Sequence, residues 1–161
     1  MRFSPGQNPI VKHLLEPAAD AAGRTSTAYI NIENAVAARL ICHIDQGNAA
    51  TIQIDPVQST LVDGTGTKAL SAVARIWSNA DCATTADAAA ATAAVNFTTS
   101  AAVKIKTVEF EIDPTAQMDV ANNFKCIGVT TGASNVANIT SAVLVVWPKH
   151  TGATAPSMIA D

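Results

Sequence analysis

Charged residues are scarce in this chain of 161 residues. Lysine, arginine, aspartate and glutamate make up 14% of it, against roughly 25% in typical soluble domains. The ten lysines and arginines are scattered, and the net charge is −3. Because nucleic-acid binding needs a concentrated basic surface, we expect no nucleic-acid partner. A surface with so little charge instead suits a protein that lies against other protein.

Long apolar runs are missing as well. The longest, Ala142–Trp147, has the length of a strand, whereas a membrane-spanning helix needs roughly 20 apolar residues. The N-terminal residues Met1–Gly6 lack the apolar core of a signal peptide. We therefore expect no membrane partner, and synthesis in a cytoplasm.

Cysteine occurs only three times, an odd number, and never with C-x-x-C spacing. Cys42 and Cys126 fall at apolar positions of expected strands, where cysteine behaves as a small core residue. Cys82 falls in a polar loop, and its redox state stays open. A structural disulfide is the less favoured reading for a chain without an export signal.

The sequence contains no catalytic or metal-binding pattern. None of His13, His43 and His150 stands at metal-ligand spacing from a second ligand type, and His43 with Asp45 is too small a set for zinc. No G-x-S-x-G elbow surrounds a serine. The glycine-rich run 63–68 lacks both the spacing and the following helix of a phosphate loop. We predict no catalytic, cofactor-binding or metal residue, and therefore no cofactor and no enzyme.

Two carboxylates and two tryptophans are further candidate site residues. Glu109 and Glu111 share one strand face, roughly 7 Å apart by strand rise, but glycosidase carboxylates come from separate elements around an aromatic-lined cleft. With only four Phe, two Trp and one Tyr in the chain, solvent-facing or interface charges are the better interpretation. Trp77 and Trp147 end their strands, which favours packing at the core or rim, or an anchor for a subunit contact.

The stretch Val103–Asp113 organises the rest of the expected fold. Its apolar residues occupy odd positions up to Lys106 and even positions after Thr107, a phase change that predicts a β-bulge or bend. The interpretation places Lys104, Lys106, Glu109 and Glu111 toward solvent or a neighbouring subunit.

Alternating patterns elsewhere predict further strands. The turn Gln46–Asn48 between two alternating runs predicts a β-hairpin, and residues 80–94 read as a surface excursion. The fold class is therefore all-β, an antiparallel β-sandwich or jelly-roll-like domain of about eight strands. The expected strands are 27–33, 36–45, 51–55, 68–77, 103–113, 124–129 and 138–147.

Both ends of the chain are broken by proline and glycine. Residues 1–24 read as an N-terminal arm in which Val11–Leu15 offers at most one helical turn. Residues 25–148 form the sandwich domain, and residues 149–161 form a C-terminal extension.

The runs Ala74–Thr85, Lys104–Asp113 and Cys126–Asn135 resemble segments of the small virion proteins of tailed bacteriophages. The broken ends, the few charges and the Ala/Thr-rich loops do so too, and capsid decoration (cement) proteins are the most similar in size and style. The resemblance covers roughly Thr25 to Trp147 as a pattern without a diagnostic motif, so no functional residue is carried over.

The resemblance implies a non-enzymatic assembly role, in which the chain binds the outer capsid surface and stabilises the head. The partner would be the major capsid protein, the chain would form a homotrimer, and its location would be the virion after synthesis in the bacterial host cytoplasm. Two alternatives stay open. One is a tail-tube or head–tail connector protein, and the other is a carbohydrate- or receptor-binding β-sandwich.

Overall fold

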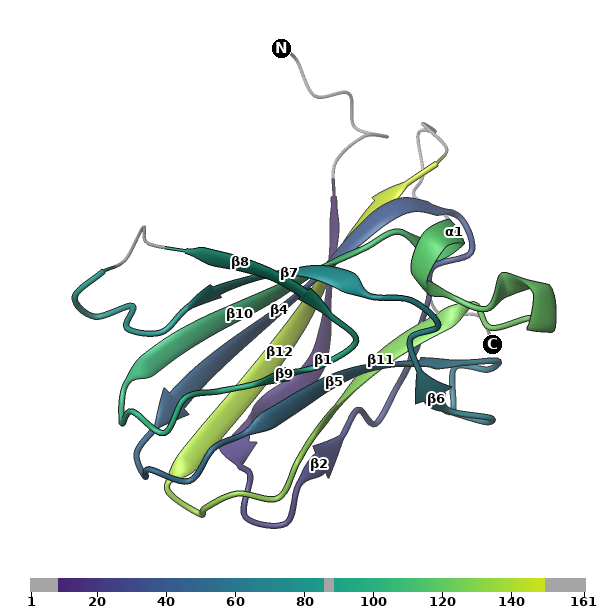
Figure 1. Ribbon diagram of the computed structural model, residues 1–161. Helices are drawn as coiled ribbons and strands as arrows, with labels where there is room; N and C mark the ends of the chain where they lie inside the picture. The colour runs from purple at the N-terminus through teal and green to yellow at the C-terminus, as the bar shows by residue number, and fades with distance from the viewer. Residues whose placement is uncertain (1–8, 86–88, 150–161) are drawn as a thin grey trace.

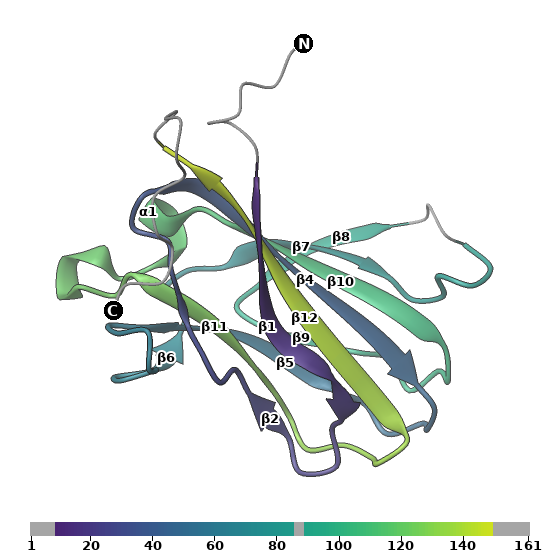
Figure 2. The ribbon, with the colours of Figure 1, turned by 180° about the vertical axis from the view of Figure 1, so that it is seen from behind.

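The computed structural model describes residues 9–85 and 89–149. Two antiparallel sheets pack face to face as separate layers (Figures 1 and 2). The prediction of an all-β sandwich is confirmed, and eight strands of the described part have five or more residues. The jelly-roll-like connectivity stays a prediction.

The larger sheet, called the six-stranded sheet below, contains the long strands of the chain. Its neighbours are antiparallel throughout, and β4 and β10 lie at its centre. In spatial order it consists of β1 (Ile10–Ala19), β12 (Asn138–Pro148), β4 (Ala35–Gln46), β10 (Ile105–Ile112), β7 (Ala74–Asn79) and β8 (Ala90–Ala94).

The second sheet is built on two strands of moderate length, β11 (Cys126–Thr131) and β5 (Gln53–Ser59), which pair with each other. A short helix, α1 (Pro114–Gln117), and a 3-10 turn, Val120–Asn122, connect β10 to β11. Four two-residue strands complete the sheet: β2 (Arg24–Thr25), β3 (Ile30–Asn31), β6 (Lys68–Ala69) and β9 (Phe97–Thr98).

The core lies between the sheets, where alternate side chains of each strand point inward. Leu40, Phe110 and Leu144 from the six-stranded sheet are fully buried with Ile54 and Ile127 from the second sheet. Cys42 belongs to this core, and its burial raises the thiol pKa to about 12. The prediction of a core role for Cys42 is therefore confirmed.

Two predicted strand connections are wrong. The turn Gln46–Asn48 makes no hairpin, because β4 pairs with β12 and β10 while β5 pairs with β11 in the other sheet. The buried Gln46 side chain donates to the carbonyls of Ala50 and Ser100, which fixes the chain as it crosses the end of the sandwich. The predicted strand 68–77 is likewise divided between the sheets, as β6 and β7.

The predicted bulge in β10 is absent from its described pairing. The register to β4 runs without a shift from Ile105 opposite Asp45 to Ile112 opposite Ala38. Lys106 therefore takes an inward position and is only 2% exposed, while Ile105 is 38% exposed. The expectation that Lys106 faces solvent or a subunit is wrong. Its ammonium donates to Gln46 Oε1 and to the Ser100 carbonyl, both at 2.7 Å, where the apolar core ends.

The buried ammonium makes stability depend on pH. Desolvation lowers the pKa of Lys106 below its usual 10.5. In the window below pH 10.5 the unfolded chain then binds more protons than the folded one, so the contribution of Lys106 to stability rises with pH through that window. Urea unfolding at a series of pH values should show wild type gaining stability relative to Lys106→Met as pH approaches 10.5. A difference that stays constant with pH would contradict this.

The segment interpreted as an N-terminal arm contributes a strand. Residues 10–19 form β1, which pairs antiparallel with β12 at the margin of the six-stranded sheet, so the expected helical turn at Val11–Leu15 is wrong. Two register shifts, around Leu15, let the strand bend along the sheet. The parts of both predicted arms at residues 1–8 and 150–161 lie outside the described residues.

Candidate functional site

The two outer faces of the sandwich differ in how they are covered. On the second sheet, the Tyr29 ring lies over β11 and is only 3% exposed, in a small cluster with Val57 and Cys126. On the six-stranded sheet, none of the outward side chains of β4, β10 and β12 is fully buried within the described structure. The outer face of the six-stranded sheet is therefore the accessible one.

The strand register divides this accessible face into two zones. One row of directly opposed residues crosses the sheet from β1 to β10. In it Val11 of β1 lies opposite Val145 of β12, Val145 lies opposite Arg39 of β4, and Arg39 lies opposite Glu111 of β10. Along this row the side chains toward β1 are apolar and those toward β7 are charged, while in the next row His13 of β1 lies beside Val143. We call Val11, Ile41, Val143, Val145 and Trp147 the apolar strip, and Arg39, Arg75, Trp77, Glu109 and Glu111 the charged cluster.

Arg39 is the centre of the charged cluster. Its guanidinium donates to Glu109 Oε2 at 3.1 Å and to Glu111 Oε1 at 2.8 Å. The Trp77 indole N–H donates to the same Glu111 oxygen at 3.0 Å, and the Arg75 guanidinium stacks 4.4 Å from the Trp77 ring. Each carboxylate thus accepts a charge-assisted hydrogen bond from Arg39, so the cluster has a defined arrangement of charges.

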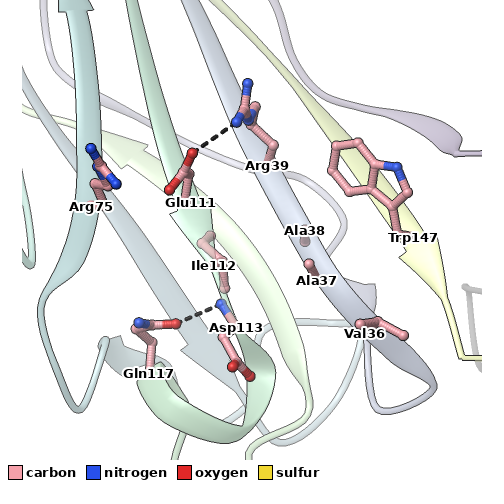
Figure 3. Close-up of a pocket in the computed structure, with 10 residues that line it drawn as sticks. All are labelled: Val36, Ala37, Ala38, Arg39, Arg75, Glu111, Ile112, Asp113, Gln117 and Trp147. Atoms are coloured by element: carbon pink, nitrogen blue, oxygen red, sulfur yellow. Dashed lines mark hydrogen bonds and ion pairs between the residues drawn. The ribbon is translucent and has the colours of Figure 1, made fainter. Parts of the chain in front are cut away.

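A hollow of about 460 Å³ lies where the two zones meet (Figure 3). Trp147 and Val36 stand on one side of it and Arg75 on the other, with Ala37 and Ala38 between them. The Gln117 side chain of α1 accepts a hydrogen bond from the Asp113 backbone N–H at 2.5 Å and closes one end. The hollow therefore offers a partner an apolar wall and a wall of mixed charge, with Arg75 beside Glu111.

Sequence reasoning placed Glu109 and Glu111 correctly on one exposed face but missed the residues that hold them. Arg39 and Trp77 are distant in sequence, and only the pairing of β10 with β4 and β7 brings them together. No local spacing signals these contacts. Both tryptophans are half-buried on the outer face rather than in the core.

The other candidate site residues are not brought together. His13 lies opposite Val143 and His43 opposite Ser141, one row apart. Asp63 accepts hydrogen bonds from Thr65, which lower the pKa of its carboxyl and fix a tight turn. Within the described residues no three side chains form a metal-ligand set, and His150 lies outside them.

Two of the cysteines are buried and the third is half-buried. Burial raises the pKa of the Cys126 thiol to about 11; this cysteine is buried as predicted, but in the Tyr29 cluster rather than in the core between the sheets. Cys82 lies with its sulfur 3.3 Å from the Thr107 hydroxyl.

Searches against known proteins return no relative. No family model, no curated protein and no solved structure matches the chain. Among the described residues, no helix has the length and hydropathy to cross a membrane.

Proposed function

We propose that this chain is a non-enzymatic structural protein that attaches to a larger protein assembly through the outer face of its six-stranded sheet. The resemblance of the sequence points to the outer capsid surface of a tailed bacteriophage, with the major capsid protein as partner and the virion as location. The chain would act there as a decoration protein that stabilises the head.

The apolar strip is the observation that carries the proposal. Val11 is 63% exposed, and the register sets it beside Val145 on the sheet. Burying such surface against a partner gains about 25 cal/mol per Å². The strip needs little ordering before it binds, because its strands are already fixed by the sheet. Many copies on one shell would add the effect of multivalency.

The charged cluster supplies specificity in this arrangement. Arg39, Glu109 and Glu111 are already paired, so a partner need not strip an isolated charge of water in order to dock beside them. The hollow between the zones then accepts a protruding side chain of the partner. A carbohydrate partner is the weaker proposal, because Trp147 is the one aromatic residue that lines the hollow in the described structure.

Replacement of Val11 tests the docking face. Val11→Lys places a charge in the apolar strip and should weaken binding about tenfold or more, the equivalent of about 1.4 kcal/mol. The assay is co-sedimentation of purified chain with heads of the phage that encodes it, assembled without it. Val136→Lys is the matched control, since Val136 is a valine of similar exposure, 71%, in the loop before β12.

Three results would count against the proposal. Equal binding by Val11→Lys and Val136→Lys would show that the apolar strip is not the docking surface. Failure of the wild-type chain to bind heads would show that it is not a decoration protein. A copy number in purified virions far below that of the major capsid protein would favour the tail-tube or connector alternative.

A further inference from the structure

The margins of the two sheets are protected unequally. A sheet edge exposes unpaired backbone N–H and C=O groups, and proteins protect edges with charges, proline, bulges or short strands. The edge strand β1 carries Lys12, Glu16 and Pro17 and two register shifts. The second sheet ends on β2 and β6, each only two residues long.

Strand β8 has none of these protections. It is five residues long, Ala90–Ala94, with no charge, no proline and an unshifted register to β7. In the described structure all of its backbone pairing is with β7, so its other side lies free along the margin of the sheet (Figure 1). The free side is a template for one more antiparallel strand.

The sequence of β8 identifies the strand that fits this template. Ala90-Ala-Thr-Ala-Ala94 reads the same in both directions around Thr92. An antiparallel copy of the same strand therefore pairs residue for residue, with Thr92 opposite Thr92 and Ala91 opposite Ala93. Directly opposed threonines form a favourable cross-strand pair, and an isologous contact of this kind closes on itself around a two-fold axis.

We propose that β8 pairs antiparallel with β8 of a second copy of this chain, around a two-fold axis through Thr92. The pairing joins the two six-stranded sheets into one continuous sheet. It gives a dimer, where the resemblance of the sequence implies a trimer. Directly opposite residues of an antiparallel pair share a face, so both copies turn their apolar strips to the same side.

The faces of β8 decide which substitutions test the pairing. Ala91 and Ala93 lie opposite Trp77 and Arg75, on the outer face, and both are exposed. Thr92 lies opposite the buried Ile76, on the inner face, and is itself exposed. Side chains at 91 and 93 can therefore be changed without entering the core.

Sedimentation equilibrium of the full chain tests the pairing, with twice the monomer mass of 16.5 kDa expected. Ala91→Lys/Ala93→Lys puts lysine opposite lysine across the axis and should give monomers, as should Ala91→Glu/Ala93→Glu. Mixing the two variants pairs lysine with glutamate and should restore a dimer. A monomeric or trimeric wild type, or a dimer that the lysine variant leaves intact, would overturn the proposal, as would a mixture that stays monomeric.

A cysteine at the axis gives a second readout. Opposite Cα atoms about 5 Å apart allow a disulfide, so Thr92→Cys in a Cys82→Ser background should form a covalent dimer under mild oxidation on a non-reducing gel. Ala94→Cys in the same background is the control, because residue 94 faces residue 90 and the two copies of 94 lie about 14 Å apart. Equal cross-linking of both variants, or none of Thr92→Cys, would contradict the axis.

Discussion

Gln46→Leu is expected to lower the free energy of unfolding by about 3 kcal/mol, the cost of leaving a buried charged donor without one of its acceptors. Gln46 is 1% exposed, and its Oε1 accepts from the Lys106 ammonium at 2.7 Å. Leucine fills a similar volume but offers no acceptor. Lys106 would keep only the Ser100 carbonyl, and the Ala50 carbonyl would lose a donor.

Urea unfolding of Gln46→Leu and two further variants measures this cost. Gln46→Leu/Lys106→Met removes the charge with its acceptor and should recover part of the loss, because an apolar pair leaves no buried ammonium to satisfy. Gln53→Leu is the control, since Gln53 is exposed and bonds only Asp55 through its side chain in the described structure. We expect it to change stability by less than about 0.5 kcal/mol. Wild-type stability of Gln46→Leu would show that the Lys106 contact contributes nothing.

Gly128→Ala is expected to destabilise the protein by about 1–3 kcal/mol through overpacking. A Cβ on Gly128 would lie 2.5 Å from Cε1 of Tyr29, well inside van der Waals contact. The ring has little room to move away, because Gly64 packs against its other edge. Gly64 lies so close that a Cβ on it would be 2.6 Å from Cε2 of Tyr29. The Tyr29 hydroxyl accepts a hydrogen bond from Thr67 at 3.2 Å, which also fixes the ring.

A double-mutant cycle separates this clash from a general effect of alanine. Tyr29→Leu shortens the side chain, so Gly128→Ala should cost less in that background than in wild type, with a coupling of about 1 kcal/mol. Gly132→Ala is the control, since its Cβ would lie 3.2 Å from Gln53 Cβ on an exposed side chain. Additive effects of Tyr29→Leu and Gly128→Ala would contradict the packing argument.

The sequence by itself determined the fold class and the longest strands. The alternation over residues 36–45 and the apolar run over residues 138–147 predicted strands that the structure extends only slightly, to Ala35–Gln46 and Asn138–Pro148. The inward position of Cys42 followed from the same alternation, whereas Cys126 is buried on the outer side of its sheet, beside Tyr29. These features are local, because the period of a strand places its inward side chains without reference to its partners.

Only the tertiary structure decided which strands pair and what the inward positions contain. The turn at Gln46–Asn48 has a hairpin pattern, yet β4 pairs with β12 and β10 while β5 pairs with β11 in the other sheet. Lys106 interrupts the apolar alternation, yet β10 stays regular because Gln46 and Ser100 accept hydrogen bonds from a lysine at the end of the core. Arg39 meets Glu109 and Glu111 only across strands. Such contacts join residues far apart in sequence, and no local period encodes them.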